Sequence, residues 1–98
     1  MAANRTVTEG TQVSLPCEVK RGFFPDEVLV RISIDNPGGA IVGYMDRKSI
    51  ISKNGSRFVL GLVMEVFRHG DARVFLPGEI VSSPNPVAVP LDWLSRYV

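Results

Sequence analysis

The stretch VFRHGDAR, residues 66–73, contains the residues of this chain whose types and spacing best fit chemistry. An imidazole, His69, follows a guanidinium, Arg68. This pair suits phosphoryl transfer, in which histidine attacks phosphorus and a cation binds the oxygens of the transition state. The same letters also fit a turn, because Gly70-Asp71 is a favoured pair for a two-residue hairpin loop between the strand patterns MEVF and ARVF.

RHGDA resembles the opening motif of the histidine phosphatases, in which Arg-His-Gly follows a strand. The resemblance implies a phosphate-binding Arg68 and a nucleophilic His69. That family uses a second histidine in a larger α/β domain, whereas His69 is the only histidine here and lies between two strand patterns. We therefore predict a hairpin turn with Phe67 opposite Val74, and no catalytic residue.

Other catalytic and metal-binding patterns are missing from the sequence. Cys17 is the only cysteine, so one Cys and one His do not form the cluster of ligands that a metal ion needs. The stretch NPGGAIVG, residues 36–43, lacks the Gly-Lys-Ser/Thr ending of a phosphate-binding loop. We expect no metal and no cofactor, and a small hydrolase is the third and least favoured function.

Length and charge limit the class of protein. Ninety-eight residues predict one domain over 1–98, with residues 1–8 as a possibly flexible start. A net charge of +1 provides no general attraction for nucleic acid or an anionic membrane. No apolar leader or run of about 18 apolar residues is present, so we expect a cytoplasmic protein without a membrane span.

The hydrophobic pattern predicts strands almost throughout. Residues 12–19 and 27–34 alternate between apolar and polar side chains, and Pro16 predicts that the first of these strands is an edge strand or a bent one. Asn54-Gly55 predicts a type I′ hairpin turn. Residues 56–68 are apolar on both sides, with Gly61 at a bulge or bend, which suggests a long strand shared by two sheets.

These elements predict an all-β fold. We favour a small SH3-like barrel of five to six mostly antiparallel strands over an OB-fold, because no helix separates the middle strands. Residues 91–98, LDWLSRYV, predict a short C-terminal helical turn.

Binding sites are predicted at three places. In KRGFFPDE, residues 20–27, we expect one of Phe23 and Phe24 to pack in the core and the other to anchor a protein partner, with Lys20 and Arg21 at its rim. The alternative is that both rings pack inward and close the end of the barrel. A cationic hairpin tip of Arg68, His69 and Arg73, joined by Arg57, is a possible anion site. Trp93 and Tyr97 are a lid on the core or a possible homodimer contact.

These sites favour a non-catalytic protein-interaction or self-association module. The alternative is a small barrel that binds nucleic acid or a phosphate-bearing ligand. Nucleic acid is the less favoured partner, since base-stacking sites alternate aromatic side chains with a basic groove.

Overall fold

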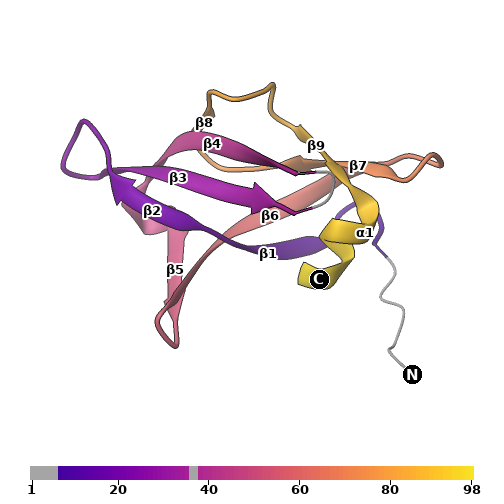
Figure 1. The fold of residues 1–98 in the computed structure, drawn as a ribbon, viewed down its shortest axis with the longest axis horizontal. Coiled ribbons are helices and arrows are strands. Elements are labelled where there is room, and N and C mark those ends of the chain that lie inside the picture. Colours follow the sequence, from indigo (N-terminus) through magenta and orange to yellow (C-terminus); the bar gives the residue numbers. More distant parts are fainter. Residues whose placement is uncertain (1–6, 36–37) are drawn as a thin grey trace.

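The computed structural model describes residues 7–35 and 38–98, which form two antiparallel sheets (Figure 1). The first sheet has the order β1 (Gln12–Pro16), β6 (Ser56–Val66), β7 (Asp71–Phe75), β9 (Val87–Pro90), and β5 (Ile50–Lys53) also pairs with β6. The second sheet has the order β2 (Glu18–Arg21), β3 (Glu27–Ile34), β4 (Gly39–Asp46), β8 (Glu79–Ile80). Three short helical segments are η1 (Arg47–Ser49), α1 (Leu91–Leu94) and η2 (Ser95–Tyr97).

The all-β class and the short C-terminal helical turn are confirmed, but the SH3-like barrel is not. Nine strands lie within the described residues, and neither sheet closes on itself. The strand expected over residues 12–19 is divided at Cys17, so that β1 joins the first sheet and β2 joins the second. Residues 79–80 and 87–90 add two short strands, which raises the count above five or six.

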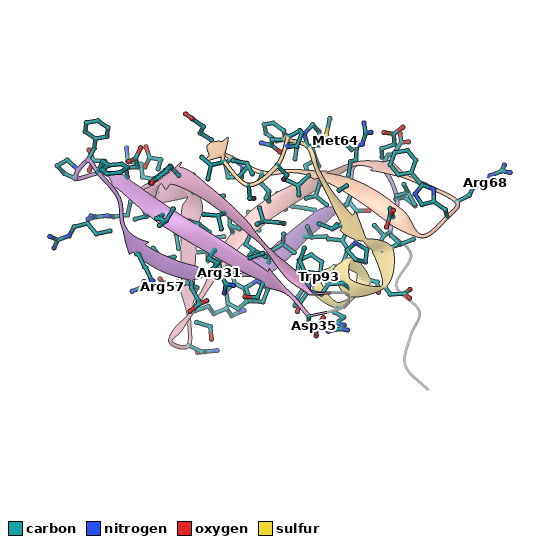
Figure 2. All side chains as sticks on the ribbon, turned by 45° about the horizontal axis from the view of Figure 1, so that its top comes forward. Arg31, Asp35, Arg57, Met64, Arg68 and Trp93 are labelled. Atoms are coloured by element: carbon teal, nitrogen blue, oxygen red, sulfur yellow. The ribbon has the colours of Figure 1, made fainter. Side chains whose placement is uncertain are left out.

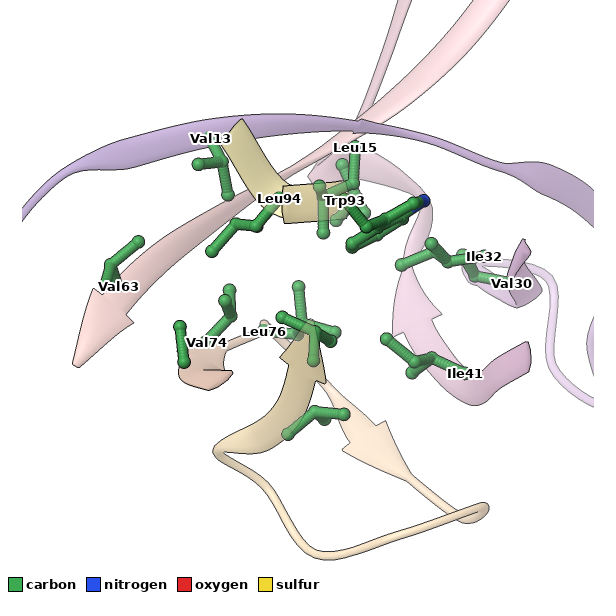
Figure 3. Close-up of a cluster of buried hydrophobic side chains, with 14 of the residues drawn as sticks. Val13, Leu15, Val30, Ile32, Ile41, Val63, Val74, Leu76, Trp93 and Leu94 are labelled. Carbon is green, nitrogen blue, oxygen red and sulfur yellow. The ribbon is translucent and has the colours of Figure 1, made fainter. Parts of the chain in front are cut away.

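The core lies between the two sheets and consists of their inward-facing apolar side chains (Figure 3). The alternation predicted for β1 and β3 is confirmed, because every second residue of each strand is buried. Trp93 and Leu94 of α1 join the same cluster and cover one end of it. The cluster comprises Val7, Val13, Leu15, Val28, Val30, Ile32, Ile41, Met45, Val59, Val63, Ala72, Val74, Leu76, Val87, Val89, Trp93 and Leu94.

The two predicted hairpin turns have different outcomes. Asn54 and Gly55 have φ values of 52° and 79°, so the type I′ turn between β5 and β6 is confirmed. The turn between β6 and β7 instead has three residues, 68–70. Phe67 N donates a hydrogen bond of 2.8 Å to Asp71 O, and Gly70 adopts a φ of 100°.

The predicted pairing of Phe67 with Val74 is therefore wrong. In the structure Val66 lies opposite Ala72, and Glu65 lies opposite Arg73. The longer loop shifts the register, and a β-bulge between Val63 and Glu65 shifts it again. The sequence predicted a bulge or bend at Gly61, whereas the structure has the bulge three residues further along the chain, at Met64.

Two sequence-based expectations involve residues that the structure does not describe. Residues 1–6 of the expected flexible start lie outside the described residues, and so do Asn36 and Pro37 of the stretch NPGGAIVG that was compared with a phosphate-binding loop. Val7 is buried in the core, and Thr8 N donates a 3.1 Å hydrogen bond to Thr11 Oγ1. None of the helices in the described ranges is long and apolar enough to cross a membrane.

Candidate functional site

His69 lies at the exposed tip of the β6–β7 hairpin. Its Nε2 is 3.0 Å from Asp71 Oδ2, and its ring stacks on Phe67 with 5.3 Å between centroids. The guanidinium carbon of Arg73 lies over the same Phe67 ring, 5.3 Å from its centroid. Arg73 Nη1 is 3.6 Å from Glu65 Oε1. His69 and Arg73 thus each pair with a carboxylate of their own hairpin. Such pairs are typical of a strand end that is exposed to solvent.

Arg57 does not join this hairpin tip, although the sequence suggested that it would. It is the second residue of β6, whereas Arg68 follows the end of that strand. Eleven strand residues span about 35 Å at roughly 3.3 Å each, and Figure 2 shows the two side chains at opposite ends of the molecule. The predicted cluster of Arg57, Arg68, His69 and Arg73 is therefore not assembled.

Phe23 and Phe24 both lie at the surface, in the loop between β2 and β3. Phe23 is 80 % exposed and Phe24 is 67 % exposed, so the expectation that one ring packs in the core is wrong. Gly22 N donates to Glu27 O at 3.1 Å, which closes the loop and makes it protrude beyond the sheet edge. The centroid of the Phe23 ring lies 5.5 Å from that of the Tyr44 ring in β4.

Lys20 and Arg21, the predicted rim of the phenylalanine site, point to different sides of β2. Arg21 lines a hollow of about 470 Å³ under the two rings, together with Arg47 of η1. Lys20 is absent from that hollow; it lines one with Glu18 and Arg31 on the solvent side of the second sheet, and a third one that it shares with Arg21. The period-2 geometry of a strand explains this separation.

Trp93 and Tyr97 form an edge-to-face pair with 5.2 Å between ring centroids. Trp93 is 2 % exposed, and Tyr97 is half-buried, so this pair packs on the core as a lid. Arg96 Nη1 binds Asp35 Oδ2 at 2.7 Å, and this hydrogen bond lowers the pKa of the Asp35 carboxyl. The ion pair holds the C-terminal turn against the end of β3.

The solvent side of the first sheet has an apolar surface that the sequence interpretation missed. Leu62 of β6 and Phe75 of β7 lie opposite each other and are 41 % and 47 % exposed. The next pair, Val63 and Val74, points into the core. We call the exposed set the outer face; its members are Ile51, Leu60, Leu62, Met64 and Phe75.

The sequence contained a clue to the outer face. Residues 56–68 are apolar on both sides, which the sequence interpretation attributed to a strand shared by two sheets. In the structure β6 belongs to one sheet only, and one of its apolar sides meets solvent. Figure 2 shows Met64 pointing away from the core.

A second unexpected feature is a hollow of about 400 Å³ between the ends of the two sheets, which we call the arginine hollow. Arg21 of β2, Arg47 of η1 and Arg57 of β6 line it. Arg47 Nη2 donates a 2.7 Å hydrogen bond to Pro25 O. The other lining residues are Val19, Lys20, Val28, Ile50 and Ser52.

Cys17 is half-buried at the point where the chain passes from β1 to β2, and it lines a separate hollow with Arg31 and Tyr97. Its N donates a 3.0 Å hydrogen bond to Arg57 O. Burial raises the pKa of the Cys17 thiol, and the positive charge of Arg57 opposes this rise to a lesser extent.

We expect iodoacetamide to alkylate Cys17 more slowly in the folded protein than in the urea-unfolded protein at neutral pH. The reason is that the thiolate is the nucleophile, and a raised pKa leaves less of it. Mass spectrometry of timed samples measures the rate. An equal or faster rate in the folded protein would show that the charge of Arg57, rather than burial, has the larger effect on the pKa of the Cys17 thiol.

No protein-family model, curated protein or solved structure matches this chain. Among the residues that the structure describes, no three His, Cys, Asp or Glu side chains come together as ligands for a metal ion. The outer face, the phenylalanine loop and the arginine hollow are the candidate sites.

Proposed function

We propose that this chain is a non-catalytic interaction module that self-associates through the outer face of its first sheet. The observation that supports this is the pair Leu62 and Phe75, which lie side by side at the centre of five exposed apolar side chains. Removing their remaining exposed apolar surface from water stabilises a contact by about 25 cal/mol per Å² buried. Contiguous exposed apolar surfaces of this kind mark interaction sites on soluble proteins.

The charges around the outer face favour a second copy of the chain as its occupant. A two-fold contact brings the same surface together from both sides, so an unpaired charge near its centre would repel itself. The centre is flanked on β1 by the neutral Gln12 and Ser14, opposite Leu62 and Leu60. On β7 the neighbouring charge of Arg73 is paired with Glu65 at 3.6 Å. Two such faces pack at the usual sheet spacing of about 10 Å.

Light scattering coupled to size-exclusion chromatography tests this proposal. We expect the parent chain to form a dimer and Leu62→Lys to be a monomer, because the substitution places two ammonium groups at the apolar contact. Phe23→Ser is the matched control, since it also removes an exposed apolar side chain but lies in the β2–β3 loop; it should leave the dimer intact. A parent chain that stays monomeric up to about 1 mM, or a dimer that Leu62→Lys leaves unchanged, contradicts the proposal.

The phenylalanine loop provides a second contact surface, for a different protein. Both rings stand clear of the core, and Arg21 and Arg47 line the hollow beneath them. Such exposed aromatic anchors beside cationic groups fit an apolar side chain next to an acidic one. The proposed partner segment therefore contains both.

We expect Phe23→Ser and Phe24→Ser to leave the free energy of unfolding unchanged within about 0.5 kcal/mol, as is usual for exposed sites. Neither ring loses core contacts on substitution, because both are mostly exposed. Thermal melts of the two variants beside the parent measure this. A loss of about 3 kcal/mol or more, the value typical of a core phenylalanine, would remove the loop from consideration as a contact surface.

Two alternative functions have less support. Binding of a phosphate-bearing ligand is supported by the arginine hollow, whereas nucleic acid would meet a net charge of only +1. A hydrolase would need a general base near a nucleophile, and His69 contacts Asp71 and Phe67 at an exposed tip.

A further inference from the structure

The arginine hollow is built from positions that face the space between the sheets. Arg21 lies on the same, core-facing side of β2 as Val19, two residues away. Likewise, Arg57 lies on the same side of β6 as the buried Val59. Arg57 lies opposite Ser52 of β5, as Val59 lies opposite Ile50. The alternation that fills the core with apolar side chains therefore places two guanidinium groups and a hydroxyl around its open end.

The arginines of the hollow have no carboxylate partner within the described residues. The four ion pairs of the described residues involve Arg31, His69, Arg73 and Arg96. Two acids at this end of the molecule are engaged elsewhere, because Glu27 accepts a hydrogen bond from Phe23 N and Asp46 accepts one from Lys48 N. Three arginines and Lys20 thus line one hollow, where the mutual repulsion of their positive charges favours an anion.

We propose that the arginine hollow binds the phosphate group of a phosphomonoester. Guanidinium groups bind phosphate and carboxylate oxygens with paired hydrogen bonds. A carboxylate has one charge and two oxygens, whereas a phosphomonoester has about −1.5 to −2 charges and three terminal oxygens at neutral pH. Three arginines from three elements, with Ser52 as a further donor, match the larger charge and the three oxygens.

The remaining lining residues indicate what the phosphate is attached to. Val28 is buried and Val19 and Ile50 are partly buried at the wall of the hollow, which gives it an apolar side. A hollow of about 400 Å³ holds more than a phosphate ion alone. The ligand is therefore an organic phosphomonoester with an apolar group, carried either by a small molecule or by a phosphorylated peptide.

This site is independent of the proposed self-association. Arg57 points to the inner side of the first sheet, whereas the outer face is on the solvent side. Arg21 and Arg47 line this hollow and also the one beneath Phe23 and Phe24, whereas Arg57 does not line the latter. Failure of phosphate binding therefore leaves the proposed self-association unchanged.

Titration of the isotope-labelled chain, followed by backbone amide NMR at constant ionic strength, tests the site. The probes are phenyl phosphate, inorganic phosphate, benzoate and a short phosphoserine peptide. We expect phenyl phosphate to bind more tightly than inorganic phosphate, to bind at least about tenfold more tightly than benzoate, and to shift amides of β2, η1 and β5. Whichever of phenyl phosphate and the peptide binds more tightly identifies the natural carrier of the phosphate.

Two variants and one control decide whether the arginines hold the probe. Arg57→Gln and Arg21→Gln should each weaken phenyl phosphate binding about tenfold, the effect of losing one charge-assisted contact. Arg68→Gln removes an exposed arginine at the opposite end of β6 that forms no ion pair with the residues the structure describes, and it should change nothing. Binding that is absent, equal for benzoate, or reduced as much by Arg68→Gln as by Arg57→Gln overturns the proposal. Two arginine variants keep the test valid if one of them fails to fold.

Discussion

Replacing Trp93 by alanine is expected to destabilise the fold by about 3–5 kcal/mol, the usual cost of truncating a buried aromatic side chain. Trp93 is 2 % exposed although it lies only five residues from the end of the chain. It packs into the core next to Leu94 (Figure 3). Its ring also contacts Tyr97 edge to face. Its removal leaves a cavity and frees the C-terminal turn from the sheets.

Urea unfolding followed by circular dichroism measures this effect. A domain of this size is stabilised by about 5–15 kcal/mol in total, so Trp93→Ala should lower the unfolding midpoint strongly. Asp92→Ala is the control in the same helical turn, because Asp92 is exposed; we expect a change within about 0.5 kcal/mol. Equal midpoints for Trp93→Ala and the parent would show that the C-terminal turn is not part of the cooperative core.

Replacing Gly78 by alanine is expected to destabilise the fold by about 2–5 kcal/mol, from a strained backbone and a collision together. Gly78 has a φ of 90°, a conformation that costs any other residue about 1–2 kcal/mol. A Cβ at this position would also collide with Tyr44 O, and it would lie 2.8 Å from Met45 Cγ. Because Tyr44 O is a backbone atom of β4, the strand β8 would have to move away from β4, its partner in the second sheet.

Gly70→Ala separates the two causes. Gly70 has a similar φ of 100°, but a Cβ there would meet no atom within 4 Å. Thermal or urea unfolding of both variants should therefore show a loss of about 1–2 kcal/mol for Gly70→Ala and a clearly larger loss for Gly78→Ala. Equal losses would mean that β8 shifts without cost and that the backbone strain alone matters.

Local patterns in the sequence were sufficient for many of the strands. The alternation in residues 27–34 predicted β3, because a strand with one buried side needs an apolar residue at every second position. Asn54-Gly55 predicted its hairpin, since both residues accept positive φ at little cost. Gly70-Asp71 looked equally suitable, yet Gly70 closes a three-residue loop. The choice depended on which side chains of β6 and β7 had to face the core, and that is a property of the packed sheets.

The candidate sites depended on tertiary structure to a greater extent. The sequence by itself determined that Phe23 and Phe24 lie in a break between strands, that residues 56–68 are apolar on both sides, and that no second histidine accompanies His69. Only the packing decided that both phenylalanine rings are exposed and that one apolar side of β6 remains uncovered. It also decided that Arg57 meets Arg21 and Arg47 instead of Arg68. The physical reason is that alternation tells which residues share a side of a strand, whereas the layer that covers this side, and the residues across the gap, come from strands distant in sequence.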